Sequence, residues 1–166
     1  MFLPLQSNAP LRVPEFEIPK PLGRLVSRLP QQPPTLALVL ALNAALGRIL
    51  PRDTLQPLIG RRVCIRVTDA GLNLNFTLTP QGFRSSSGAG APDLSITARA
   101  CDFLALALRQ EDPDTLFFNR RLVMEGDTEL GLLVKNTLDS IDLPRLTPAH
   151  LAPKRVMATV GRLMGR

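Results

Sequence analysis

Residues 112–142 read DPDTLFFNRRLVMEGDTELGLLVKNTLDSID. A short strand is predicted at residues 122–124, and the run EGDT that follows it supplies a turn glycine and a helix cap. Beyond this run, apolar residues recur at intervals of three and four, which is typical of one face of a helix. The stripe comprises Leu130, Leu133, Val134, Leu138 and Ile141. Because such a face must be buried, the segment is predicted to form a wall of an apolar cavity and not a catalytic loop.

The same stretch carries a resemblance to a known family. The run RRLVMEGDTELGLLVKNTLDSID, residues 120–142, resembles the strand, Gly-Asp turn and helix near the end of sterol carrier protein type 2 domains. From residue 112 onward it is more similar still to a bacterial branch of that superfamily, the accessory factors of ubiquinone biosynthesis. The resemblance covers residues 61–142 and implies an α/β lipid-binding fold with an apolar cavity. For the bacterial branch it also implies an isoprenoid ubiquinone intermediate or ubiquinone as cargo, an oxygen-independent route, and hydroxylation proteins of the pathway as partners.

Length and composition fit one domain with an aliphatic interior. A chain of 166 residues is the size of a single domain that can bury a sizeable core. Hydrophobic residues make up 45% of it, Trp and Tyr are absent, and seven Phe are the only aromatic residues. The interior is therefore predicted to consist mainly of Leu, Val, Ile and Ala, which suits acyl or prenyl chains.

The charge balance favours anionic partners. Twenty Lys and Arg against fourteen Asp and Glu give a net charge of +6. Single-stranded nucleic acid needs aromatic platforms for its bases, of which this chain has few, so no nucleic acid is expected. An anionic membrane surface fits the same charge. No signal peptide is recognisable at the start of the chain, so a cytoplasmic location is expected, with a possible peripheral position at the inner membrane.

Proline content divides the chain. Eight of the sixteen prolines precede Thr35, so residues 1–34 are predicted to be an extended arm with a short helix at 22–29. Residues 35–142 are predicted to be the lipid-binding domain, and residues 143–166 a connector and a basic amphipathic helix. A helix predicted at 35–50 is apolar nearly all round but too short to span a bilayer. Two interpretations stay open for it: a core helix, or a helix that roofs a lipid cavity or touches membrane.

Alternating apolar and polar residues predict the sheet. A hairpin of strands at 63–67 and 72–79 turns at 69–71, and further strands are predicted at 83–87 and 94–97. Helices are predicted at 102–109 and from Pro113 onward. The predicted fold class is therefore α+β, a mostly antiparallel sheet of about five strands with helices covering one face and enclosing an apolar lipid cavity.

Two sets of residues are candidate binding sites. The predicted lipid-lining residues are Leu36, Leu40, Ile65, Leu74, Phe76, Leu78, Phe83, Leu94, Ile96, Phe103, Leu104, Leu108, Phe117, Phe118, Leu122, Met124, Leu130, Leu133, Val134 and Leu138. The predicted membrane or partner contacts are Arg155, Val156, Val160, Arg162, Leu163 and Arg166. The second set forms an amphipathic pattern typical of helices on anionic bilayers, and packing of this tail on its own domain is the alternative.

Catalytic and metal sites are not expected. The single histidine, His150, lies in a Pro-rich connector, and Cys64 and Cys101 have no second thiol nearby, so both should pack as small apolar residues. The serines at 85–87 lack the strand-to-helix elbow of a nucleophile, and the glycines at 88–90 do not precede a helix.

Acidic clusters at 111–114 and 125–129 sit at turns and helix starts, where capping explains them. Arg120 and Arg121 are expected either at the mouth of an apolar pocket or in ion pairs with these acids.

The sequence leaves three hypotheses for the function of the protein. The leading hypothesis is a non-enzymatic lipid-binding accessory factor without cofactor or metal, whose cargo is an isoprenoid quinone intermediate or, alternatively, a phospholipid carried at the membrane surface. The second is an enzyme on a lipid-like substrate, with Glu125, Asp127 or His150 as acid or base. The third is a basic module for nucleic acid, whose affinity would fall steeply with salt.

Overall fold

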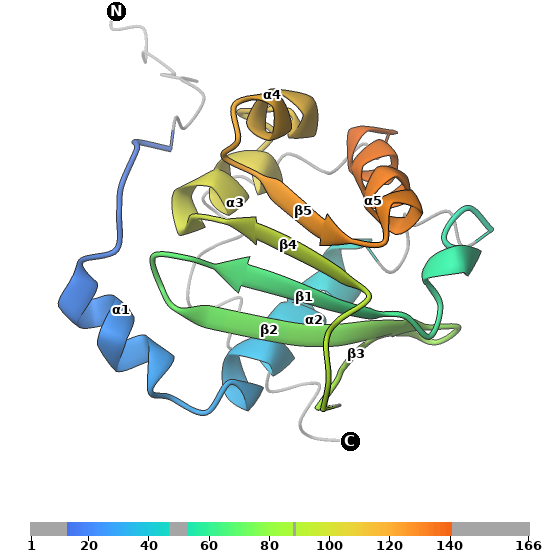
Figure 1. Cartoon of the computed structure of the whole chain (residues 1–166), viewed down its shortest axis with the longest axis horizontal. Coiled ribbons are helices and arrows are strands. Elements are labelled where there is room, and N and C mark those ends of the chain that lie inside the picture. The colour runs from blue at the N-terminus through green and yellow to red at the C-terminus, as the bar shows by residue number, and fades with distance from the viewer. Residues whose placement is uncertain (1–12, 47–52, 88, 141–166) are drawn as a thin grey trace, which may run out of the picture.

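The structure is a computed structural model that describes residues 13–46, 53–87 and 89–140 (Figure 1). Five α-helices, one 3-10 helix and five strands lie within these ranges. In chain order they are α1 Lys20–Ser27, α2 Gln32–Leu46, η1 Gln56–Leu58, β1 Arg62–Val67, β2 Leu72–Thr79, β3 Gly82–Ser85, β4 Leu94–Ala98, α3 Ala100–Ala107, α4 Pro113–Phe118, β5 Val123–Gly126 and α5 Thr128–Ser140.

The five strands form one sheet in the order β3-β2-β1-β4-β5. Strands β1 and β4 run parallel, and the other three neighbouring pairs are antiparallel. The predicted α+β fold with a mostly antiparallel sheet is thus confirmed. In Figure 1 the sheet faces the viewer and α2 lies behind it.

Alternation along the strands gives the sheet one apolar face. Val63 is paired with Phe76 across the hairpin, and Ile65 with Leu74, so these four side chains point to the same side. The parallel pairing of β1 and β4 sets Ile96 beside Ile65 on that side. Helix α2 packs against β2 and β3, and α5 packs against β5 and α4. Together these elements enclose one core of Leu, Ile, Val and Phe side chains.

Several element boundaries differ from those predicted. Helix α2 begins at Gln32, because Pro33 and Pro34 occupy its first turn, where the missing N–H of proline costs no hydrogen bond. For the same reason α1 begins at Lys20, ahead of Pro21. Helix α3 starts two residues earlier than predicted and β3 ends two residues earlier, while α4 begins at Pro113 and α5 at Thr128 as expected.

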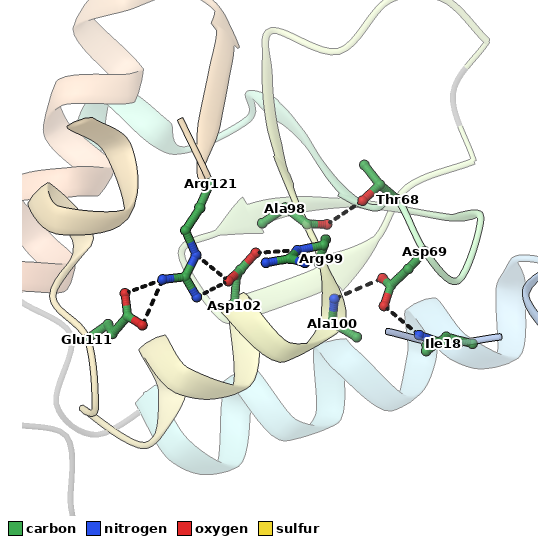
Figure 2. Close-up of polar contacts among 9 residues, drawn as sticks. All are labelled: Ile18, Thr68, Asp69, Ala98, Arg99, Ala100, Asp102, Glu111 and Arg121. Carbon is green, nitrogen blue, oxygen red and sulfur yellow. Dashed lines mark hydrogen bonds and ion pairs between the residues drawn. The ribbon is translucent and has the colours of Figure 1, made fainter. Parts of the chain in front are cut away.

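A buried carboxylate joins α3 to the segment that leads into β5 (Figure 2). The Asp102 side chain is fully buried, and it accepts hydrogen bonds from Arg121 Nε at 2.9 Å and Arg99 Nε at 3.2 Å. Arg121 also donates from Nη1 to both carboxylate oxygens of Glu111 at 2.8 Å. The hydrogen bonds from Arg121 to Glu111 and Asp102 raise the pKa of the arginine. This network confirms the ion-pair expectation for Arg121, although its main partner lies nineteen residues away in sequence.

A second carboxylate connects the N-terminal segment to the domain. Asp69, in the β1–β2 turn, accepts the backbone N–H of Ala100 at 2.9 Å and that of Ile18 at 3.2 Å (Figure 2). The first bond satisfies a free donor at the start of α3. The second holds the chain just before α1, so the position of α1 is set by the hairpin turn.

Gly126 ends β5 where two backbones come unusually close. Its φ is +112°, and a Cβ at this position would lie 2.3 Å from the carbonyl oxygen of Asp93. The next residue, Asp127, donates its N–H to that same oxygen at 2.8 Å. Only glycine fits here, since any side chain would both strain the backbone and separate β5 from β4.

We expect Gly126→Ala to lower the free energy of unfolding by about 2 kcal/mol or more, through backbone strain and steric overlap together. Gly60→Ala is the matched control, because Gly60 also has a positive φ of +79° but has no atom within 4 Å of its would-be Cβ. The control should lose only the strain contribution, about 1 kcal/mol. Urea unfolding of the two variants measures the difference, and equal losses would contradict the steric account.

Removal of the buried carboxylate should destabilise the domain more than removal of an exposed one. We expect Asp102→Ala to cost about 3 kcal/mol of unfolding free energy, because Arg99 and Arg121 are left without their buried partner. Asp139→Ala, at an exposed position of α5, should change the unfolding free energy by less than about 0.5 kcal/mol. Chemical denaturation checks both variants, and similar midpoints for the two would show that the network contributes little.

Candidate functional site

The apolar face of the sheet is the candidate site. Its central side chains are closely covered, with exposed fractions of 2% for Val63 and 1% for Leu94. Phe76 and Phe83 meet edge to face, with ring centroids 5.8 Å apart. The side chains of this face are aliphatic and aromatic. They favour a hydrocarbon ligand, because its binding depends on buried apolar area and not on directed hydrogen bonds.

Most of the predicted lipid-lining residues lie on the covered side of their elements. Eight of them are buried: Leu74, Phe76, Leu78, Phe83, Leu94, Ile96, Leu122 and Leu130. Eight more are partly buried: Leu40, Ile65, Phe103, Leu108, Met124, Leu133, Val134 and Leu138. Within the two groups, the core brings together residues from all five strands and from α3 and α5.

Four predicted lining residues point outward instead, which corrects their assignment to an inner face. They are Leu36, Leu104, Phe117 and Phe118, with exposed fractions of 48%, 37%, 42% and 78%. In α2 the buried positions include Thr35, Val39 and Leu46, and Leu36 projects from another side of the helix. In α4 only Pro113 and Leu116 are buried. These helices are apolar on several sides, so their sequences carry no polar stripe that marks the solvent side.

Some core residues were absent from the predicted set. Leu116 is fully buried, and Val63, Leu55 and Leu58 are between 2% and 5% exposed. Val63 belongs to the alternation that identified β1, so the same signal could have placed it. Leu55 and Leu58 are three residues apart around a short 3-10 helix, a spacing too brief to give a periodic pattern.

Two of the pockets that described residues form lie elsewhere on the domain. One, of about 510 Å³, lies between α1 and the β1–β2 turn and is lined by residues such as Lys20, Arg24 and Asp69. The other, of about 240 Å³, lies between the start of α2 and β3 and is lined by Gln31, Thr35 and other polar residues. Neither is lined by any predicted lipid-lining residue, so the enclosed apolar cavity stays a prediction.

The acidic clusters have structural roles, as predicted. Asp112 accepts the N–H of Thr115 at 2.7 Å and its hydroxyl at 2.6 Å, which caps α4. These bonds lower the pKa of the Asp112 carboxyl. Asp127 caps α5 by accepting the N–H groups of Glu129 and Leu130, and Asp114 pairs with Lys135.

The candidate acid and base groups are not assembled into a reactive centre among the described residues. Glu125 is exposed and lies 3.9 Å from Arg66, and Asp127 is engaged as a cap. His150 lies outside the described ranges. Within those ranges no three His, Cys, Asp or Glu side chains are grouped in a way that could hold a metal ion.

The two cysteines behave as small buried residues, as predicted. Cys64 and Cys101 are each 3% exposed, and neither forms a disulfide. Burial raises the pKa of the Cys64 thiol, although Arg66 nearby acts in the opposite direction. A thiol of this kind is a poor nucleophile at neutral pH.

None of the helices within the described ranges has both the length and the apolar character needed to cross a bilayer. The six predicted membrane or partner contacts of the tail lie outside the described residues. They are Arg155, Val156, Val160, Arg162, Leu163 and Arg166.

Similar proteins are known in bacteria. The chain is 48% identical over 95 residues to the ubiquinone biosynthesis accessory factor UbiT of Escherichia coli K12, a match that covers 57% of this chain and 54% of UbiT. UbiT of Escherichia coli O157:H7 matches equally well. The chain thus spans about half the length of these curated relatives. Their name, accessory factor, describes no catalytic activity.

The fold is also found in a solved structure. The ubiquinone synthesis protein UbiJ-SCP2 superposes with a TM-score of 0.54 and 22% sequence identity, over 66% of this chain and 97% of that protein. Residues 42–139, from the middle of α2 to the end of α5, match the SCP-2 sterol transfer family. With its five-stranded sheet and one covered apolar face, the chain belongs to the SCP-2 sterol transfer family.

Proposed function

We propose that this protein is a non-catalytic lipid-binding accessory factor of ubiquinone biosynthesis. It holds an isoprenoid ubiquinone intermediate, or ubiquinone itself, and presents it to hydroxylation proteins of the oxygen-independent route. The similarity to UbiT over 95 residues and the SCP-2 sterol transfer domain support this proposal. The proposed location is cytoplasmic, with peripheral contact at the inner membrane.

The observation that carries the proposal is the placement of α2 and α5. Helix α2 packs against β2 and β3, whereas α5 packs against β5 and α4, so the two helices cover opposite ends of one apolar face. A prenyl chain would lie between the two helices, beside the side chains of this region that are only partly buried. Partly buried side chains such as Ile65, Met124 and Leu133 belong to this region and would contact the chain. Its affinity would follow the buried apolar area, at roughly 25 cal/mol per Å² before ordering costs.

A phospholipid is the second candidate cargo. The net charge of +6 favours anionic headgroups, and an acyl chain would use the same apolar face as a prenyl chain. In this form of the proposal, the basic tail with Arg155, Arg162 and Arg166 docks on the membrane while the domain exchanges its lipid. Packing of the tail on its own domain is the alternative.

Bound cargo distinguishes these possibilities. We expect organic extraction of natively purified protein, followed by mass spectrometry, to release about one prenyl quinone or quinone precursor per chain. A phospholipid in its place would favour the carrier function. A blank extract together with turnover of a lipid-like substrate would contradict the proposal and favour an enzyme.

The position of the cargo can be tested with two neighbouring leucines of α5. Leu133 is partly buried against the core, whereas Leu132 is 56% exposed. We expect Leu133→Arg to reduce the extracted lipid at least about tenfold, because a cation placed against the hydrocarbon chain is costly to desolvate. Leu132→Arg should keep the full cargo. If Leu133→Arg remains folded by circular dichroism and keeps its cargo, the proposed position is wrong.

A further inference from the structure

The smaller of the two pockets, between the start of α2 and the end of β3, is lined by polar groups without charge. Its volume is about 240 Å³, and its walls include Gln31, Thr35, Asn75 and the serines at 85–87. Sites that enclose a drug-sized ligand have volumes of roughly 300–1,000 Å³, so this pocket has room for one substituted ring. Its hydroxyl and amide groups favour a neutral ligand that donates and accepts hydrogen bonds.

Several of these polar groups are available to a ligand. The side chains of Asn75, Ser85 and Ser86 form no hydrogen bond with another residue in the described ranges. Gln31 differs, because its Oε1 accepts the backbone N–H of Asn73 at 3.0 Å. The pocket therefore has one wall held in place by the edge of β2, and other walls whose donors and acceptors are open to a ligand.

The pocket adjoins the edge of the apolar face of the sheet. Ser85 is paired with Phe76, so both side chains point to the side of the sheet that carries this face. Thr35 is buried one helical turn before Val39, which belongs to the core. Two walls of the pocket thus stand next to core side chains.

A row of apolar side chains starts beside the pocket and crosses four strands. In order of their cross-strand pairing, its members are Leu74, Ile65, Ile96 and Met124. Leu74 is next in sequence to Asn75, which lines the pocket. Three steps between strands, of about 4.8 Å each, make the row about 14 Å long. Because Ile65 and Met124 are only partly buried, a hydrocarbon chain that leaves the pocket would meet apolar side chains in this direction.

The start of α2 does not provide a site for an anion. Free N–H groups at a helix N-terminus commonly bind anions. In α2, however, Pro33 and Pro34 have no N–H, and the N–H of Thr35 is bonded to the carbonyl oxygen of Gln31 at 3.1 Å. An anionic head group would lose its hydration here without gaining an opposite charge. A neutral ring only exchanges hydrogen bonds with water for hydrogen bonds with the pocket.

We propose that this pocket binds the neutral ring of a prenylated phenol or quinone, and that the prenyl chain leaves it along the row that starts at Leu74. The Asn75 amide and the Ser86 hydroxyl donate hydrogen bonds to ring carbonyl oxygens and accept them from ring hydroxyl groups. This inference rests on the proposed function and adds specificity to it. The chain is bound through buried apolar area, whereas the ring is selected by hydrogen bonds.

Three probes with the same tail of two isoprene units test the inference on the unchanged full chain. They are a ubiquinone with a two-unit tail, geraniol, and geranyl diphosphate, each titrated calorimetrically. We expect the quinone to bind at least about tenfold more tightly than geraniol, because it gains about two hydrogen bonds in the pocket. Geranyl diphosphate should bind no more tightly than geraniol. Equal affinity for all three probes, or tightest binding of the diphosphate, would overturn the proposal.

Substitutions in the walls locate the ring. We expect Asn75→Ala/Ser86→Ala to weaken binding of the quinone about tenfold and to leave binding of geraniol unchanged. Asn73→Ala is the matched control, because Asn73 is an exposed residue of the same strand whose side chain does not line the pocket. It should bind every probe as the unchanged protein does. Equal loss in the control, or full quinone affinity in a double variant with native circular dichroism, would overturn the proposal.

Failure of this inference and failure of the proposed function give different results. If the protein binds prenyl chains but the pocket does not hold the ring, the three probes bind alike and the double variant changes none of them. If the protein binds no prenyl lipid, none of the three probes binds, and the proposed function fails together with the inference. A misfolded double variant leaves the decision to the comparison of probes on the unchanged protein.

Discussion

The one-sided pattern of the central strands determines the rest of the structure. Strand β1 is paired with β2 on one side and with β4 on the other, and the registers place Val63, Phe76 and Leu94 on the same face. A slip of one residue in either pairing would turn a whole strand's apolar side chains to the opposite face. Helices α2 and α5 then have a single surface on which to bury their own apolar sides. The candidate lipid site is a property of this surface and not of any one residue.

Two carboxylates hold the periphery to this centre. Asp102 connects α3 to Arg121 ahead of β5, and Asp69 connects the β1–β2 turn to the start of α3 and to the segment before α1. Asp102 accepts hydrogen bonds from arginine side chains, and Asp69 accepts them from backbone N–H groups. In both cases the donors would otherwise lack partners, and they include residues far away in sequence. The apolar face supplies most of the burial, while these polar contacts fix the directions in which α1 and α3 leave the sheet.

Periodic sequence signals predicted the parts of the fold where one face is polar. The β1–β2 hairpin and the start of α5 at Thr128 are of this kind, because alternation and capping are local. Orientation within apolar helices was less predictable: Leu36 and Phe118 were assigned inward and lie outward. The pairing of Asp102 with Arg121 depends on tertiary contact, which no local spacing encodes.

The two ends of the sheet are short. Strands β3 and β5, at its edges, have four residues each, compared with eight in β2. An exposed edge offers unpaired N–H and C=O groups to other chains, and long flat edges are a common origin of aggregation. In a chain that is 45% hydrophobic, such brief edges leave little backbone on which a second molecule could add a strand. The short edge strands therefore lower the tendency of this apolar-rich domain to form intermolecular sheets.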